Sequence, residues 1–185
     1  MNTFEEFDKL IEIGRIFKDY ELFLLALDKF NKALSIKDLP LNKELIAEAY
    51  HQRGIVKYQL GNEEEAIKDE NIAIQLNNKN SQFFFHRGIS NYVLDRNELA
   101  INDFDNAIKL NTKNGVFFHF RGLAKIAIKQ TLDAIKDFDL AEELDFKTSD
   151  LFLDRGKAKY DSGKYEQAMK DFYMSKQIED FNLDE

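Results

Sequence analysis

Residues 83–88 read FFFHRG: three phenylalanines, then a histidine, an arginine and a glycine. A histidine beside an arginine is compatible with a catalytic site or with a structural repeat, and the rest of the chain distinguishes the two. The Arg-Gly pair recurs at a constant interval of 34 residues, as Arg53-Gly54, Arg87-Gly88, Arg121-Gly122 and Arg155-Gly156. The stretch is therefore one copy of a repeated unit.

Two further residue types keep the same interval. An aromatic residue precedes each arginine by three positions, at Tyr50, Phe84, Phe118 and Phe152. An alanine follows each glycine by twelve positions, at Ala66, Ala100, Ala134 and Ala168. The aromatic residue and the glycine are four residues apart, so they share one face of a helix, and small residues on a second helix allow close packing against that face.

This register resembles the tetratricopeptide repeat, a 34-residue helix-turn-helix unit. The resemblance implies an all-α fold, a right-handed α-α superhelix or solenoid of five such repeats with ten helices, because no single unit can bury its apolar face alone. A degenerate first copy follows from aligning Gly14 with the later glycines, and six extra residues separate it from the second copy. The expected repeats form one array over residues 1–185, at 7–40, 47–80, 81–114, 115–148 and 149–182.

The turns between paired helices depart from the pattern in the two middle copies. Gly61 and Gly163 stand at this turn in the second and fifth repeats, whereas Asp95 and Lys129 replace glycine in the third and fourth. These two turns must therefore form without the conformational freedom of glycine.

The repeated arginine has a structural explanation. An aspartate follows each arginine by sixteen residues, giving the pairs Arg53 and Asp69, Arg87 and Asp103, Arg121 and Asp137, and Arg155 and Asp171. In the first copy Ile13 and Lys29 replace both members together. We predict a partly buried, bidentate ion pair between the two helices of each unit, in preference to direct contact of the arginine with a ligand.

Composition favours a folded protein and disfavours several functions. Hydrophobic residues make up 44% of the chain and aromatic residues 13%, which is enough apolar surface for a packed core. The formal net charge of −8 disfavours nucleic acid as a partner. No cysteine is present, the first residues do not resemble a secretory signal, and no stretch is long enough to span a bilayer. We therefore expect a cytoplasmic protein without membrane insertion.

Catalytic chemistry has no recognisable motif in this sequence. The metalloprotease helix motif, the serine elbow and the phosphate loop are all missing. The histidines His51, His86 and His119 fall on three successive first helices, but His86 is one position out of step, so a shared metal site is not expected. We expect no enzyme activity, no metal and no cofactor; an enzyme or small-ligand protein that uses these histidines is the alternative.

The family resemblance implies that the first helices line a concave groove in which peptides dock. The residues predicted to contact a ligand lie on one face of these helices: His51, Ile55, Phe85, Ile89, His119, Leu123 and Leu153. We expect Phe85, His119 and Leu153 to be exposed in the groove, and Tyr58, Tyr92 and Tyr160 to pack between neighbouring first helices. Some family members bind the carboxylate of a chaperone tail with lysines and asparagines, but this chain holds other residues there, such as Ile11, Arg15, Gln52, Val116 and Phe120.

These features predict a non-catalytic module that binds a protein or peptide segment in its groove. The alternative is a self-associating scaffold or chaperone-like component that uses an uncapped carboxy-terminal end. The last expected helix, around Tyr165 to Ile178, has no polar capping helix after it. Three alternatives follow for its apolar surface: the chain forms a homodimer through it, the surface stays exposed, or the chain is part of a longer protein.

Overall fold

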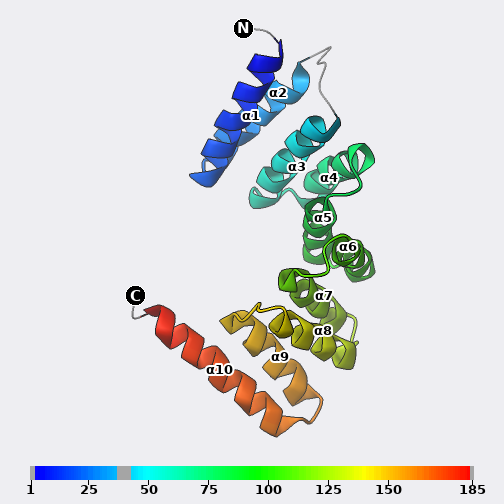
Figure 1. Cartoon of the computed structure of the whole chain (residues 1–185), viewed down its shortest axis with the longest axis vertical. Coiled ribbons are helices and arrows are strands. Elements are labelled where there is room, and N and C mark those ends of the chain that lie inside the picture. The colour runs from blue at the N-terminus through cyan, green and yellow to red at the C-terminus, as the bar shows by residue number, and fades with distance from the viewer. Residues whose placement is uncertain (1–2, 37–42, 184–185) are drawn as a thin grey trace. The chain divides into compact units, whose positions relative to one another are not determined.

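The computed structural model describes residues 3–36 and 43–183, and within these ranges it contains ten α-helices and no strand (Figure 1). The fold class is the predicted one, an all-α solenoid of helical repeats. The chain divides into two compact units, Met1–Asp95 and Arg96–Glu185. The boundary falls in the turn between α5 and α6, inside the third predicted repeat. Within the described residues, every helix is too short or too polar to cross a lipid bilayer.

The first unit contains five helices in the part of the chain that the structure describes. They are α1 (Thr3–Asp19), α2 (Phe23–Ser35), α3 (Lys43–Gln59), α4 (Glu63–Leu76) and α5 (Ser81–Val93). The pairs α1–α2 and α3–α4 form helical hairpins, and α2 packs on α3 as α4 packs on α5. The final residues of the first predicted repeat, 37–40, lie outside the described ranges.

The second unit also contains five helices among its described residues. They are α6 (Asn97–Leu110), α7 (Gly115–Ala127), α8 (Thr131–Glu143), α9 (Ser149–Asp161) and α10 (Tyr165–Leu183). Here α7–α8 and α9–α10 form hairpins, α6 packs on α7, and α8 packs on α9. Each unit therefore repeats one contact, in which the second helix of a predicted repeat packs on the first helix of the next. The right-handed single array over 1–185 stays a prediction.

Close packing inside a hairpin depends on glycine in the first helix. A Cβ atom at Gly122 would lie 2.6 Å from Cε1 of Phe138, and one at Gly156 would lie 2.6 Å from Cε1 of Phe172. Real Cβ contacts are not this short, so the phenylalanine ring occupies space that glycine leaves free. The repeated alanines are also buried, with less than 2% of their surface exposed: Ala66, Ala100, Ala134 and Ala168.

The turns between paired helices all contain one residue in the left-handed region. This residue is Gly61 or Gly163 in two repeats, but Glu21, Asp95 and Lys129 occupy it elsewhere, with φ of 58°, 56° and 63°. At Lys129 the backbone N–H donates to the carbonyl of Ile126, and the next N–H donates to the carbonyl of Lys125, both at 2.9 Å. This is the hydrogen-bond pattern of a glycine-type helix end. Three turns therefore adopt the glycine conformation with a side chain in place.

Candidate functional site

The seven predicted contact residues fall at two positions of the first helices, one turn apart. The first position holds His51 on α3, Phe85 on α5, His119 on α7 and Leu153 on α9. The second position holds Ile55, Ile89 and Leu123 on α3, α5 and α7. In the first unit these residues lie on α3 and α5, and in the second unit on α7 and α9.

The first position is almost closed to ligands. His51 and His119 are 5% exposed, Phe85 is 8% exposed, and Leu153 is half-buried. The predicted exposure of Phe85 and His119 was therefore wrong. The physical reason is visible at His119, whose ring lies 5.6 Å from that of Phe138 and 5.4 Å from that of Phe146. Neighbouring first helices also contact each other within a unit, α3 with α5 and α7 with α9.

Accessible apolar surface lies further along the same helices. Ile55, Ile89 and Leu123 are half-buried, as are Tyr58 and Tyr92 in the first unit. In the second unit Ile126 is 36% and Tyr160 54% exposed, so the expected packing of Tyr160 between first helices was wrong. The sequence interpretation placed the exposed surface of these helices one turn too close to their start.

His51 belongs to a buried polar cluster in the first unit. Its Nδ1 lies 2.9 Å and 3.1 Å from the two carboxylate oxygens of Glu70, which is 1% exposed. The rings of His51 and His86 are 5.0 Å apart. Burial, followed by repulsion from His86, Lys18 and Arg15, lowers the pKa of His51 to about 3. Burial and then Lys18 lower the pKa of His86 to about 4, so both rings are neutral at pH 7.

His119 has different surroundings in the second unit. Its Nε2 lies 3.1 Å from Oδ2 of Asp154, and its Nδ1 is buried without a hydrogen-bond partner in the structure. A carboxylate is an acceptor only, so Nε2–H donates to Asp154. Across the described ranges, no group of three histidine, aspartate or glutamate residues is arranged to hold a metal ion.

The arginines of the repeat make bidentate contacts within three hairpins. Nε and Nη2 of Arg53 donate to the carboxylate of Asp69 at 2.8 Å and 2.7 Å. The same two bonds are 2.9 Å and 2.6 Å from Arg121 to Asp137 and 3.0 Å and 2.8 Å from Arg155 to Asp171. Arg87 and Asp103 belong to different units, and their pairing stays a prediction.

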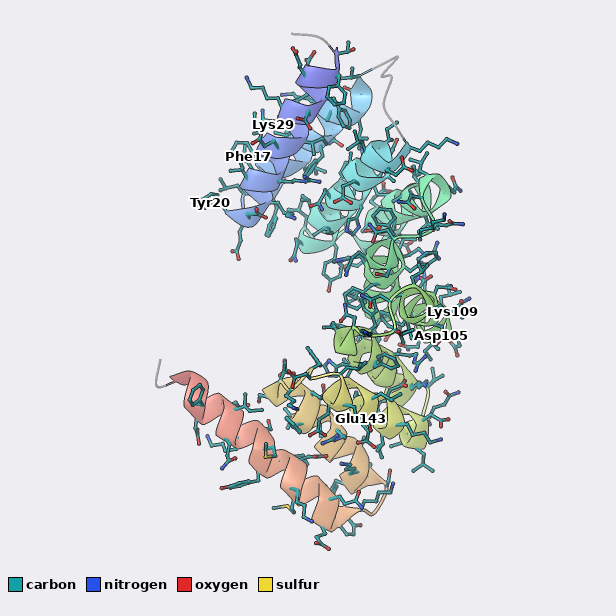
Figure 2. The ribbon with its side chains drawn as sticks, viewed as in Figure 1. Phe17, Tyr20, Lys29, Asp105, Lys109 and Glu143 are labelled. Atoms are coloured by element: carbon teal, nitrogen blue, oxygen red, sulfur yellow. The ribbon has the colours of Figure 1, made fainter. Side chains whose placement is uncertain are left out.

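Two further sets of residues complete this network, and the sequence interpretation did not include them. A lysine four residues after the arginine contacts the same aspartate: Lys57 with Asp69 at 2.8 Å, Lys125 with Asp137 at 2.7 Å, and Lys159 with Asp171 at 2.9 Å. Nη1 of each arginine donates to a residue of the preceding second helix: Asn31 (3.0 Å), Asn71 (2.6 Å), Asp105 (2.6 Å; labelled in Figure 2) and Asp139 (2.9 Å). The recurrence of lysine in three copies was the signal available in the sequence. Each arginine thus links its own repeat to the one before.

A different apolar surface lies on α10, which within the described residues of the second unit contacts α9 and no other helix. Three large side chains four residues apart along it are exposed: Tyr165 by 59%, Met169 by 64% and Tyr173 by 64%. A shallow apolar hollow on this helix is lined by Glu166, Met169, Lys170, Tyr173 and Met174. This surface matches the expectation that the last helix is left uncovered.

Comparison with known proteins agrees with this architecture. The tetratricopeptide repeat model matches residues 47–80, which are the bounds predicted for the second repeat. No curated protein sequence matches the chain.

Several solved structures share the fold. MamA from Desulfovibrio magneticus RS-1 is 15% identical with a TM-score of 0.82, and the match covers 94% of this chain and 95% of that one. PilF of Pseudomonas aeruginosa is 19% identical with a TM-score of 0.81, covering 94% and 76%. YrrB, described as a TPR protein with an unusual peptide-binding site, is 20% identical with a TM-score of 0.72, covering 91% and 84%. At these identities the likeness shows the fold alone.

Proposed function

We propose that the chain, whose residues 47–80 match the tetratricopeptide repeat model, is a non-catalytic interaction module that binds a peptide or protein segment along its first helices. The preorganised helices lower the ordering cost of binding, since the ligand alone must give up conformational freedom. A cytoplasmic location belongs to this proposal, because a chain without cysteine suits a reducing compartment.

One observation carries the proposal. The same position of three successive first helices holds a half-buried aliphatic residue, at Ile55, Ile89 and Leu123. Each unit continues this surface with aromatic or aliphatic side chains, Tyr58 and Tyr92 in the first and Ile126 and Tyr160 in the second. Apolar surface at repeated positions suits a ligand segment with apolar side chains, such as an amphipathic helix or an extended strand. The buried His51, Phe85 and His119 would shape this surface from below.

The test uses peptides selected from a displayed library on the wild-type chain. Their affinity is then measured for an Ile89→Lys, Leu123→Lys variant and for a matched control, Leu99→Lys, Leu132→Lys. Both control leucines are exposed on second helices, by 55% and 59%. We expect the first variant to lose at least tenfold in affinity and the control to bind like wild type. Equal binding by both variants would place the ligand elsewhere and contradict the proposal.

A second candidate function is self-association through the carboxy-terminal helix. The observation that favours it is the exposed apolar surface of α10, since large uncovered apolar surfaces mark interaction sites. The mass of the chain over a range of concentrations would test it. A mass that stays that of one chain at every concentration would exclude this candidate and leave peptide binding untouched.

A further inference from the structure

The interface between consecutive repeats is built the same way four times within the two units. A second helix packs on the next first helix in α2–α3, α4–α5, α6–α7 and α8–α9. In each, the arginine of the first helix donates to an asparagine or aspartate of the second helix. These four contacts serve as a template. They show which residues α1 and α10, the first and last helices described, would need in order to pack on further helices.

Two residues at the ends of the template are more exposed than their equivalents. Met169 is 64% exposed, whereas Ile135, its equivalent one repeat earlier, is 4% exposed, and the earlier equivalents Leu27, Ile67 and Ile101 are half-buried. Ile16 on α1 is 46% exposed, while its equivalents Val56, Ser90, Ala124 and Ala158 are at most 2% exposed. In the α8–α9 interface Ile135 and Ala158 belong to one apolar cluster. Met169 and Ile16 therefore occupy the two sides of such a contact, and both side chains are exposed.

The polar bridge of the template is replaced at both ends together. Ile13 stands on α1 where the other first helices have arginine, and Tyr173 stands on α10 where the other second helices have asparagine or aspartate. If a helix with the arginine packed on α10, the arginine would meet the Tyr173 ring and hydroxyl in place of an amide or carboxylate. If a helix with the aspartate packed on α1, the carboxylate would meet Ile13 and no cation, which is costly when water is excluded. Ile13 and Tyr173 suit each other better than either suits an internal partner.

The order of these positions also matches. Helices in such a contact are antiparallel, so Met169 and Tyr173 on α10 would meet Ile16 and Ile13 on α1 in the order in which Ile135 and Asp139 on α8 meet Ala158 and Arg155 on α9.

We infer that α10 of one copy binds α1 of a second copy in the arrangement of α8 on α9, so that copies of this chain join head to tail. The occupant of the exposed α10 surface is the first hairpin of another copy, which takes the place of a sixth repeat. This inference specifies the partner and geometry of the self-association given above as the second candidate, and it does not depend on peptide binding. A head-to-tail contact joins two different surfaces, so assemblies lengthen as concentration rises.

Sedimentation of the full chain and of variants blocked at one end provides the test. Met169→Glu, Tyr173→Glu closes the α10 surface, and Ile16→Glu closes the α1 surface. We expect wild type to form species larger than dimers as concentration rises and each variant alone to remain monomeric. An equimolar mixture of the two variants should form dimers and nothing larger, because one open surface of each kind remains. The control Leu99→Glu, Leu132→Glu should assemble like wild type.

Cysteine trapping gives a second measurement that tolerates weak association. The chain has no cysteine, so Ile13→Cys and Tyr173→Cys each introduce a single thiol. Mild oxidation of the mixture should give the 13–173 disulfide several-fold in excess over both symmetric products. An excess of the 173–173 product, together with dimers of Ile16→Glu alone, would overturn the inference and leave a symmetric α10 dimer. A wild-type chain that stays monomeric and untrapped would overturn both the inference and the second candidate function.

Discussion

His51 on α3 and Glu70 on α4 form a buried hydrogen bond, with Nδ1 and Oε1 2.9 Å apart. Other hairpins place a phenylalanine at the position of Glu70, for example Phe138, which packs against glycine of the first helix. The second repeat has thus exchanged an apolar contact for a polar pair. Such pairs are costly to break and often neutral to replace as a whole by apolar groups.

This exchange predicts opposite results for two substitutions of Glu70. Glu70→Ala removes the partner of the buried His51 ring and leaves a cavity, so we expect a loss of about 3 kcal/mol in the free energy of unfolding. Glu70→Phe should lose less than about 1 kcal/mol or gain stability, because His119 and Phe138 already show that a histidine and a phenylalanine fit these positions. Urea unfolding of both variants at pH 7 measures the difference. A Glu70→Phe variant with a free energy of unfolding as low as that of Glu70→Ala would contradict this prediction.

Two histidines of the first unit, His51, which is buried, and His86, which is half-buried, predict acid sensitivity. Their pKa values are about 3 for His51 and about 4 for His86 in the folded chain, below 6.5 in the unfolded chain. The unfolded state therefore binds more protons below pH 6.5, and stability that is full above this pH falls as the pH decreases. The slope approaches about 1.4 kcal/mol per pH unit for each histidine.

Urea unfolding from pH 7.5 to 5 measures this slope above the range in which ordinary carboxylates titrate. A His86→Leu variant serves as the control and should show about half of the wild-type slope, because one of the two titrating groups is removed. A wild-type stability that is constant or increases between pH 6.5 and 5 would show that the rings are already charged in the folded chain.

Alanine at the glycine positions should be destabilising according to what each Cβ atom meets. At Gly122 the new atom would lie 2.6 Å from the Phe138 ring, and we expect a loss of about 2 kcal/mol. At Gly54 the nearest atom is the Glu70 carboxylate oxygen at 3.1 Å, which a small side-chain shift relieves, so the loss should be smaller. Thermal unfolding of Gly122→Ala and Gly54→Ala ranks the two; the reverse order would contradict the packing described.

The positive φ at Lys129 predicts a stabilising substitution. Lys129→Gly relieves the strain of a side chain in the left-handed region, and we expect a gain of about 0.5–1 kcal/mol after the added entropy of the unfolded chain is subtracted. The reverse change at the equivalent turn, Gly61→Ala, should cost about 1 kcal/mol, since no neighbouring atom within 4 Å adds a clash. Chemical unfolding of both variants gives the signs, and a loss on Lys129→Gly would be inconsistent with this turn.

The arginine network predicts unequal roles for two aspartates that bind Arg121. Asp137 is 3% exposed and receives both Arg121 and Lys125, whereas Asp105 is 41% exposed and receives Nη1 of Arg121 at 2.6 Å. Asp137→Ala leaves cations without a buried partner, and we expect a loss of about 3 kcal/mol. Asp105→Ala should lose less than about 1 kcal/mol, because an exposed pair is screened by water. Equal losses in urea unfolding would show that burial does not separate the two contacts.

The sequence by itself determined the helical repeat. An interval of 34 residues, kept by arginine, glycine, aromatic residues and alanine, specifies paired helices whose apolar faces must be buried on neighbours, and this local pattern is independent of distant contacts. The spacing of sixteen residues from Arg121 to Asp137 also identified groups that face each other across a hairpin. The sequence also located the turn in which Lys129 replaces glycine, but the left-handed backbone of Lys129 is seen in the structure alone.

Tertiary structure alone decided which repeated residues are exposed. His119 and Tyr160 lie on similar faces of α7 and α9, yet His119 is enclosed by Phe138 and Phe146 while Tyr160 is open. A helical period gives the direction of a side chain but not the distance of the next helix at each turn, and burial depends on that distance. The same reason applies to Met169, which is 64% exposed while its equivalent Ile135 is 4% exposed, because the exposure of each depends on whether another helix packs beside it.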